Sequence, residues 1–450
     1  MSRRSYPKYK PSRVEWLGAI PEHWGVRKLK HISSIEFSNV DKHTIEGERP
    51  VRLCNYVDAY HNDFITADLN FMEATAPSAQ IAKFALRGGD VIITKDSEAW
   101  DDIAVPAYVS SDMHEVLCGY HLAQIRPDPK WADGKYLFRA FCSRGINDQF
   151  RVAATGITRY GLGKYWLDNG LFLVPPVEEQ RAIAAFLDRE TGRIDALIDK
   201  KQRQIELLQE KRAALISHAV TRGLDRNVKI KPSGIEWLGE IPEHWEILRL
   251  KFLIEFVTSG SRGWAKYYSD DGVMFLRIGN LSRVSLNLNL IDLQLVEPPA
   301  GAEVERTRVK QGDVLISITA YVGSVSVIEE DIGEAYVNQH IALSRPLPGK
   351  VESKWIGYVL LSEIGQRQFR FQLYGGTKEG FGLDDVKNLC ILMPALYEQK
   401  TIVSFLDQET EKIDTLITRI QESIDRLKEY RTALISAAVT GQIDIREEAA

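Results

Sequence analysis

The chain contains one long stretch twice, and this internal repeat restricts the possible folds more than any other feature. Residues 10–30, KPSRVEWLGAIPEHWGVRKLK, return at 231–251 as KPSGIEWLGEIPEHWEILRLK, with 14 of 21 positions identical at a shift of 221. A period near 220 residues is far too long for a solenoid repeat. The sequence therefore predicts a duplicated domain, with two lobes related by an internal pseudo-two-fold axis.

The repeat resumes towards the end of each half at a shift of 219. The segment LDRET at 187–191 corresponds to LDQET at 406–410, and fainter matches between the anchors stay in register. By contrast, residues of about 35–118 and 257–337 share almost nothing beyond one Gly-Asp-Val step. Each half is therefore a shared frame around a private block. The fainter matches pair Gln149-Phe150-Arg151 with Gln368-Phe369-Arg370, His121 with His340, and Arg126-Pro127 with Arg345-Pro346.

A long amphipathic helix is predicted at the end of each half. After Pro176 and Pro394 the chain is rich in Ala, Leu, Glu, Lys, Gln and Arg, which are strong helix formers. Apolar residues recur at alternating steps of four and three, as in a heptad seam. Such a helix needs a partner for its apolar stripe, and a two-fold relation favours antiparallel pairing of the two copies. The seam residues are Ile194, Ile198, Ile205, Leu208 and Leu215, then Ile413, Ile417, Ile420, Ile424, Leu427 and Leu434.

Two positions interrupt this seam. Lys201 stands where the second copy has Ile420, and Arg212 and Arg431 are basic at one equivalent position. A polar residue in a seam costs stability and fixes the register of the helices. We favour that structural role for the two arginines, and direct contact with DNA is the alternative.

The bulk properties exclude several classes of protein. A chain of 450 residues is too long for one core, and no run approaches the roughly 18 apolar residues of a membrane helix. Its four scattered cysteines contain no CxxC pair, which fits a reducing cytosol. A net charge of −5 does not favour a nucleic-acid binder, although residues 1–30 hold eight Lys and Arg against two Glu. That basic segment is either a solvated tail or a set of phosphate contacts.

Catalytic motifs are missing from the sequence. It contains no GxGxxG after a strand, no Walker loop, no HExxH and no GxSxG elbow. His23 and His244 stand beside tryptophans, and His121 and His340 have apolar surroundings, so we expect structural roles for all four. The carboxylate pairs at 101–102 and 384–385 are not shared between the lobes. We therefore expect a binding protein with no catalytic residues and no metal site.

The two copies of PSxxEWLGxIPEHW, each followed by a private block, resemble the specificity subunits of Type I restriction–modification systems. The P-P/A-x-x-E-Q segments at 175–180 and 394–399 strengthen the resemblance, as do FLDxET and RxALISxAVT in each half. The resemblance covers the whole chain. It implies an α+β fold, with two pseudo-two-fold related α/β target-recognition domains joined by two long antiparallel coiled-coil helices.

The same resemblance implies a division of the chain and a set of partners. We expect recognition domains at 1–175 and 225–394 and spacer helices at 176–224 and 395–445. Each domain would read one half of a bipartite asymmetric sequence in double-stranded DNA. Two modification subunits, which bind S-adenosylmethionine, and ATP-driven restriction subunits would join the chain in the cytoplasm. The chain itself would carry no cofactor and no active site.

Residues that read bases are expected in the private blocks, because residues identical in both lobes cannot explain different half-sites. Arg, Asn and Lys are among the residue types that pair with base edges in the major groove. The candidates for base reading are Arg52, Asn55, Lys95, Asp96 and Trp100 in the first half and Arg262, Arg277, Asn280, Thr319 and Tyr321 in the second.

Phosphate contacts are expected in a shared glycine-spaced loop, at 156–161 and 375–380. Each copy offers a hydroxyl and a cation on flexible backbone, although a plain turn with a solvated cation explains the pattern equally well. The candidate residues are Thr158 and Arg159 in the first copy and Thr377 and Lys378 in the second.

The predicted helix of 30 residues at 191–220 would be about 45 Å long, close to the roughly 35 Å between half-sites one DNA turn apart. That spacing suggests a gap of about six to eight unspecified base pairs. Two rival interpretations stay open: a two-lobed adaptor for a ligand other than DNA, and an enzyme with an active site in one private block.

Overall fold

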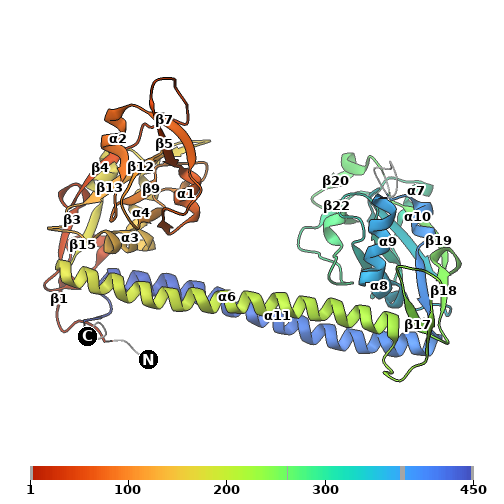
Figure 1. The fold of residues 1–450 in the computed structure, drawn as a ribbon. Coiled ribbons are helices and arrows are strands. Elements are labelled where there is room, and N and C mark those ends of the chain that lie inside the picture. The colour runs from red at the N-terminus through yellow and green to blue at the C-terminus, as the bar shows by residue number, and fades with distance from the viewer. Residues whose placement is uncertain (1–3, 261, 375–380, 447–450) are drawn as a thin grey trace. The chain divides into compact units, whose positions relative to one another are not determined.

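The computed structural model describes residues 4–260, 262–374 and 381–446. The chain divides into two compact units, one formed by residues 1–200 and 422–450 and the other by residues 201–421. Each unit contains one globular lobe and part of both long helices (Figure 1). We call residues 4–175 lobe 1 and residues 225–394 lobe 2.

Lobe 1 contains a five-stranded sheet in the order β4-β13-β9-β11-β6 and a four-stranded sheet in the order β7-β5-β12-β8. Strand pairs β1-β2, β10-β14 and β15-β3 complete it. The strands are β1 Tyr9–Pro11, β2 Ala19–Pro21, β3 Gly25–Lys28, β4 Ser33–Phe37, β5 Arg49–Cys54, β6 Phe64–Ile65, β7 Met72–Ala76, β8 Ala85–Leu86, β9 Val91–Thr94, β10 Asp96–Ser97, β11 Pro106–Val109, β12 Met113–Cys118, β13 Leu122–Pro127, β14 Tyr160–Gly161 and β15 Leu171–Val174. The helices are α1 Tyr56–His61, α2 Ser78–Phe84, α3 Gly134–Cys142, α4 Arg144–Ala153 and α5 Lys164–Asn169, with 3₁₀ turns η1 Glu15–Leu17, η2 Leu29–His31 and η3 Trp100–Asp102.

Lobe 2 contains two four-stranded sheets, in the orders β19-β26-β23-β24 and β20-β22-β21-β25, and the pairs β16-β17 and β18-β27. The strands are β16 Ile230–Pro232, β17 Glu240–Pro242, β18 Glu246–Arg249, β19 Ile254–Ser259, β20 Tyr268–Ser269, β21 Val273–Leu276, β22 Gln294–Val296, β23 Val314–Ser317, β24 Val325–Val327, β25 Ala335–Val337, β26 Ile341–Pro346 and β27 Cys390–Met393. The helices are α7 Ala302–Thr307, α8 Ser353–Leu361, α9 Glu363–Tyr374 and α10 Leu383–Lys387, with 3₁₀ turns η4 Leu250–Phe252, η5 Trp264–Tyr267 and η6 Ile278–Asn280.

The two lobes share part of their strand arrangement, although the sequences of the private blocks are unrelated. In lobe 1, β13 lies between β4 and β9, and in lobe 2, β26 lies between β19 and β23. The second sheet pairs β12 with β5 in parallel in one lobe and β25 with β21 in parallel in the other. Cores of similar volume accept many apolar side chains, so the arrangement persists where residue identity does not. The duplication therefore extends through the regions that have diverged in sequence.

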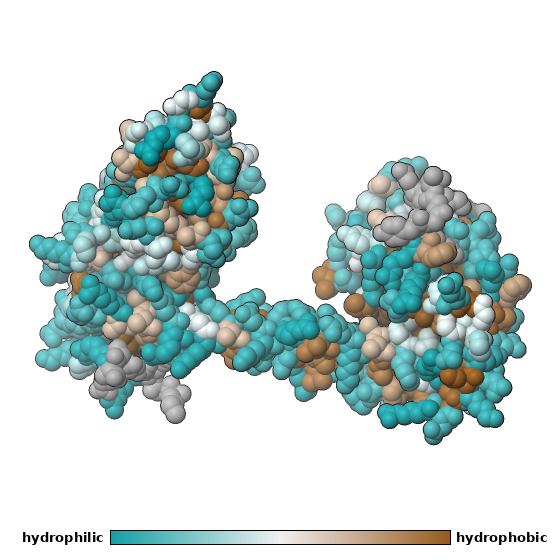
Figure 2. All heavy atoms as spheres, in the orientation of Figure 1, coloured by the Kyte–Doolittle hydropathy of each residue, from teal (hydrophilic) through white to brown (hydrophobic). Residues whose placement is uncertain are grey.

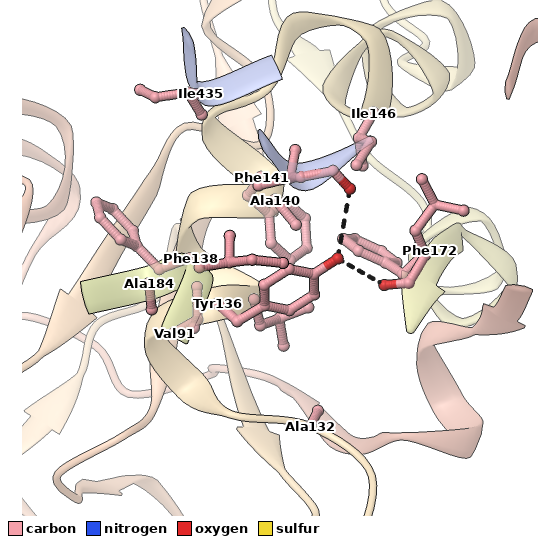
Figure 3. Close-up of a cluster of buried hydrophobic side chains, with 14 of the residues drawn as sticks. Val91, Ala132, Tyr136, Phe138, Ala140, Phe141, Ile146, Phe172, Ala184 and Ile435 are labelled. Carbon is pink, nitrogen blue, oxygen red and sulfur yellow. Dashed lines mark hydrogen bonds between the residues drawn. The ribbon is translucent and has the colours of Figure 1, made fainter. Parts of the chain in front are cut away.

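The core of lobe 1 joins the shared frame to the long helices. Figure 3 shows Tyr136, Phe138, Phe141 and Phe172 packed together in this core, and Ile435 belongs to the same cluster. The hydroxyl of Tyr136 lies 2.9 Å from the carbonyl oxygen of Leu173 and 3.4 Å from that of Val439. The end of the last helix is thereby fixed to the lobe by both apolar packing and a buried polar group.

The two long helices are α6 Val177–Arg222 and α11 Leu396–Val439. The sequence placed the spacer segments at 176–224 and 395–445; each helix begins one residue after the start of its segment, α6 ends two residues before 224 and α11 ends six residues before 445. The first turns of α6 extend beyond the 30 residues of the predicted seam, and Ile183 and Leu187 are fully buried in the core of lobe 1. Along the seam, Ile194, Ile205 and Ile413 are buried, as the heptad pattern predicts.

Two equivalent ion pairs show that the helices run antiparallel. Arg431 of α11 donates to Asp195 of α6 at 2.9 Å. Arg212 of α6 donates to Asp414 of α11 at 2.5 Å. From Asp195 to Arg212 the residue number rises along α6, while the number of the paired residue on α11 falls from 431 to 414. A shift of 219 residues converts each pair into the other. This reciprocity is the signature of a two-fold relation, and it supports the structural role of both arginines.

The two ion pairs differ in one respect. Arg431 also donates to Asp63 of lobe 1 at 2.9 Å. Arg212 is buried, and within the described residues Asp414 is the one carboxylate with which it forms an ion pair. We therefore expect Asp414→Ala to lower the free energy of unfolding by about 2 kcal/mol, because it leaves a buried guanidinium without a carboxylate. Asp195→Ala should cost under about 1 kcal/mol, since Arg431 is more exposed and keeps Asp63. Urea unfolding of both variants checks this, and equal losses would contradict it.

Hydrophilic side chains cover most of the visible surface of the helices, with a few hydrophobic side chains among them (Figure 2). Leu197, Leu207 and Leu416 are exposed hydrophobic residues of these helices. No helix in the described part of the chain combines the length and apolar character needed to cross a bilayer.

Candidate nucleic-acid interface

The repeated PEHW motif joins each lobe to the start of its own long helix. In lobe 1, Glu179 of α6 accepts hydrogen bonds from His23 Nε2 at 2.7 Å and from Trp24 Nε1 at 3.2 Å. Glu398 of α11 accepts the equivalent bonds from His244 and Trp245, at 2.9 and 3.1 Å. Both tryptophans are fully buried. The repeated motif is therefore a structural joint, as expected for the two histidines.

Other shared residues also have structural partners. The amide of Gln149 bonds both backbone groups of Leu171, and the amide of Gln368 bonds both backbone groups of Cys390. The conserved pairing of side chain and strand fixes α4 against β15 and α9 against β27. These residues, which are identical in the two halves, therefore have structural roles. This agrees with the expectation that residues shared by both lobes do not read bases.

The shared Gly-Asp-Val step places a buried carboxylate in each lobe. Asp90 pairs with Arg126 at 2.8 Å, and Asp313 pairs with Arg345 at 2.7 Å. Both carboxylates are almost completely buried. Burial raises the pKa of Asp313, although the hydrogen bonds from Arg345 and from the backbone of Lys310 work against that rise. In lobe 1, both members of this ion pair also line a surface pocket, together with Arg87 and Arg181.

Three segments converge in the same way in both lobes next to this sheet. In lobe 1, the backbone N–H of Lys95 donates to the carbonyl of His121, and the carbonyl of Lys95 accepts from Leu162. In lobe 2, the N–H of Ile318 donates to His340, and its carbonyl accepts from Phe381. The same backbone hydrogen bonds therefore hold two loops in each lobe. The loop after β9 corresponds to the loop after β23, and the loop before β13 corresponds to the loop before β26.

The side chains on this frame form a charged cluster in lobe 1. Asp96 accepts from Lys95 Nζ at 2.5 Å and contacts His121 Nδ1 at 3.0 Å, while Arg159 lies 3.1 Å from His121 Nε2. Burial alone would raise the pKa of Asp96, but the bonds from Lys95 and His121 lower it more, so the pKa lies below its ordinary value. The ring of Tyr120 is exposed beside this cluster. Within this cluster Lys95 is buried, whereas the side chains of Asp96 and His121 are about one-quarter exposed.

The positions of Lys95 and Asp96 carry neutral side chains in lobe 2. Thr319 replaces Asp96 and contacts His340 Nδ1 at 2.8 Å, and Gln339 replaces Tyr120 and contacts His340 Nε2 at 2.9 Å. Ile318 stands in the place of Lys95. The histidine is the common element, and its neighbours differ in charge and hydrogen-bonding capacity between the lobes.

The other candidates for base reading in lobe 1 occupy separate places. Trp100 is exposed in η3, and Arg52 is half-buried on β5 with its guanidinium 5.8 Å from the ring centre of Phe71. Asn55 caps α1 together with Asp58, whose carboxylate accepts from the Asn55 backbone at 2.7 Å. The structure gives Asn55 a local structural role, so only part of its polar capacity is available to a base.

In lobe 2 the structure argues against one candidate. Asn280 is 1% exposed, and its amide donates to the carbonyls of Asn289 and Asp292, so it cannot reach a base in this conformation. Sequence alone could not separate a polar residue that fixes a loop from one that faces a ligand. Arg277 is half-buried and donates to Asp292 at 3.1 Å, whereas Tyr321 and Arg262 are exposed.

Two of the four candidate phosphate contacts lie in the part of the chain that the structure describes. Thr158 and Arg159 are exposed in the loop before β14, and the latter belongs to the charged cluster. Thr377 and Lys378 lie outside the described residues. The sequence assigned His121 and His340 to packing alone. Their repeated position beside the two most divergent loops could have indicated a place in the interface.

No group of three His, Cys, Asp or Glu side chains is placed to hold a metal ion within the described residues. The four cysteines are free thiols, and burial raises the pKa of Cys54 and Cys118. The side chains of the surface where the three segments converge are mostly polar.

Comparisons with known proteins agree with this architecture. Residues 242–426 match the family model of the Type I restriction modification DNA specificity domain. The chain is 24% identical over 329 residues to the Type I restriction enzyme MjaVIII specificity subunit of Methanocaldococcus jannaschii, covering 72% of this chain and 74% of that one.

Two solved structures have the same fold. One, from work on complex assembly and conformational transition of the type I R-M system, superposes with a TM-score of 0.69 at 21% identity, covering 93% of this chain and 98% of the other. The HsdS subunit from Thermoanaerobacter tengcongensis gives a TM-score of 0.52 at 20% identity, covering 94% and 98%.

These findings show what the chain is similar to. The match to the family model covers most of lobe 2 and the first part of α11, and the likeness in fold to the solved structures extends along almost the whole chain. The predicted α+β fold with two long helices is confirmed. The likeness to curated specificity subunits agrees with the class of protein expected from the sequence.

Proposed function

We propose that each lobe reads one half of a bipartite, asymmetric sequence in double-stranded DNA. One observation carries this proposal. The same backbone frame presents Lys95, Asp96 and Tyr120 in lobe 1 but Ile318, Thr319 and Gln339 in lobe 2. Because base edges are distinguished by patterns of donors and acceptors, two lobes with different patterns read different half-sites.

The partners follow from the class of subunit. We propose that the chain recruits two modification subunits, which bind S-adenosylmethionine and methylate adenine, together with ATP-dependent restriction subunits in the cytoplasm. The chain itself holds no cofactor. In this arrangement α6 and α11 set the separation of the two half-sites, because their paired seam fixes the register of one helix on the other.

Neither rival interpretation accounts for the divergent loops as well. An adaptor for another ligand would share the joints and helices, yet it gives no reason for equivalent positions to differ in donors and acceptors. An enzyme with an active site in one lobe would need reactive groups there. The charged cluster of lobe 1 instead keeps its carboxylate paired with Lys95.

The experiment that tests the proposal maps methylated adenines in the host genome and in a strain lacking this chain. We expect a bipartite asymmetric motif that disappears with the chain. Replacing residues 35–118 by an unrelated private block should change one half of the motif and leave the other half intact. An unchanged set of methylated sites after deletion would overturn the proposal.

Arg159→Ala is expected to weaken binding of the assembled complex to DNA by a similar factor on every sequence. The reason is that a cation in the shared glycine-spaced loop contacts phosphates, which position the protein without specifying bases. Competition binding with cognate and unrelated duplexes measures the two factors. A change in which sequence is methylated would show that Arg159 reads a base.

A further inference from the structure

Two ammonium groups on the surface of lobe 1 share one neutral acceptor. Lys28 Nζ and Lys30 Nζ each donate to Oδ1 of Asn169 at 3.1 Å, so the two charges lie within twice that distance of each other. Both lysine side chains are exposed. Within the described part of the chain, neither forms an ion pair with a carboxylate. This arrangement concentrates positive charge that an anion would neutralise.

The acceptor belongs to a short helix that exposes two aromatic rings. Tyr165 and Trp166 of α5 are 69% and 53% exposed, and their ring centres lie 5.5 Å apart in an edge-to-face arrangement. The Asn169 amide nitrogen donates to the carbonyl of Tyr165 at 2.8 Å, which leaves its oxygen for the two lysines. Aromatic rings and lysine side chains therefore form one surface, the α5 surface, which consists of Lys28, Lys30, Tyr165, Trp166 and Asn169.

The α5 surface is a property of lobe 1 and not of the shared frame. At the positions of Tyr165 and Trp166, lobe 2 has Asp384 and Asp385 on α10. The cation equivalent to Lys28 is Arg249, which donates to a backbone carbonyl, that of Asn388, at 3.0 Å. Since lobe 2 folds in the same way without them, the exposed rings are not required for the frame.

The α5 surface continues from the candidate interface. Helix α5 follows β14, which pairs with β10, the strand that carries Asp96. Lys164, the first residue of the helix, donates to the carbonyl of Ile35 on β4 at 2.9 Å and so fixes α5 against the main sheet. The charged cluster and the α5 surface are therefore linked through the β10–β14 pair of lobe 1.

We propose that the α5 surface binds the DNA backbone beside the half-site read by lobe 1. This inference rests on the proposed function and adds a contact outside the base-reading loops. Paired ammonium groups match a phosphate, and sequence-independent contacts to phosphates from lysine supply much of the affinity for DNA. The two rings pack against the adjacent sugar or base edges. The neighbouring carboxylate of Asp168 pairs with Lys164 and not with these two lysines, and two cations without an ion-pair partner in the described part of the chain favour an anionic ligand such as DNA.

The test uses the full chain assembled with its modification subunits. The variant Lys28→Gln/Lys30→Gln should reduce the slope of log affinity against log salt by about one to two, given a slope near 0.9 per neutralised phosphate. Affinity should fall equally on the methylated sequence and on unrelated duplexes. Tyr165→Ala/Trp166→Ala should lower affinity about fivefold or more with the salt slope unchanged, because stacking is uncharged.

The matched control is Arg249→Gln/Lys251→Gln, which removes the same charge from the equivalent positions of lobe 2. Hydroxyl-radical footprints should lose protection beside the half-site of lobe 1 only with the lysine and aromatic variants. Unchanged footprints and slopes would overturn the inference, as would loss of modification subunits with DNA contacts intact. A wild-type complex without preference for the methylated sequence would contradict the proposed function instead, and the footprints would still test the α5 surface.

Discussion

Replacing Asp188 by alanine is expected to lower the free energy of unfolding by about 3 kcal/mol, because it leaves a buried guanidinium without its counter-ion. Arg139 is 2% exposed and donates two hydrogen bonds to Asp188, at 3.2 and 2.7 Å. Lys135 contacts the same carboxylate at 2.8 Å. These contacts hold the start of α6 against α3.

The duplication supplies the control, since Asp407 occupies the equivalent position in lobe 2. Its partners are Lys354 and the hydroxyl of Tyr358, at 2.9 and 2.7 Å, so its removal leaves no buried guanidinium. Asp407→Ala should cost about 1–2 kcal/mol, the loss of ordinary hydrogen bonds to a charged group. Denaturant unfolding measures both losses, and an Asp407→Ala variant that loses as much as Asp188→Ala would contradict the argument.

The Asp188 contribution should also depend on pH in a defined direction. Partial burial raises the pKa of this carboxyl, but hydrogen bonds from Lys135 and Arg139 lower it more, so the folded-state pKa lies below the ordinary value. The contribution is therefore complete above the unfolded-state pKa near about 4 and is lost as pH falls through the folded-state pKa. The stability difference between wild type and Asp188→Ala should shrink in acid.

Arg345→Ala is expected to cost about 3–5 kcal/mol, because it leaves the carboxylate of Asp313 buried with no cation. Asp313 is fully buried and accepts from Arg345 Nε and Nη2 at 2.7 Å each. Arg126→Ala in lobe 1 should cost only about 2 kcal/mol, since Asp90 keeps a hydrogen bond from Gln124 at 2.7 Å. Comparable losses in the two variants would show that this extra bond has no effect.

The stability difference between wild type and Arg345→Ala should also shrink in acid, but because the variant gains stability rather than because wild type loses it. Burial already raises the pKa of Asp313 in the folded protein, and removing the guanidinium raises it further. A folded-state pKa above the unfolded one means that protonation favours the folded state. The variant should therefore recover part of its lost stability as pH falls towards that raised pKa, which unfolding curves at several pH values would measure.

The sequence predicted the frame well because the frame is held by residues that recur. The histidine and tryptophan of each PEHW motif donate hydrogen bonds to a glutamate of the shared E-Q segment, Glu179 in one half and Glu398 in the other. A sequence with one copy of each motif would give no reason to pair the two motifs. The seam arginines were recognised from their equivalence alone. Two occurrences of each residue at one spacing gave the comparison that a single sequence ordinarily lacks.

The interface was predicted less well because polar residues in divergent loops have two possible uses. Asn280 faces inward and fixes a loop, while Asp96 and Lys95 reach the partly exposed cluster, and their residue types do not distinguish these outcomes. The common sheet of the private blocks also escaped prediction. Its strands conserve only apolar character and order, and comparison of residue identities does not detect either property.

The reciprocal ion pairs impose a condition on how the protein can change over evolutionary time. From Asp195 to Arg212 is 17 residues along α6, and from Asp414 to Arg431 is 17 residues along α11. A short insertion between the paired residues of one helix alone would move one arginine away from its aspartate. It would also rotate the apolar seam residues beyond the insertion away from the partner helix. Insertions that preserve both pairs must occur in both helices, in matching number and in whole heptads. Lengthening of α6 between Asp195 and Arg212 therefore keeps both ion pairs only when α11 lengthens equally between Asp414 and Arg431.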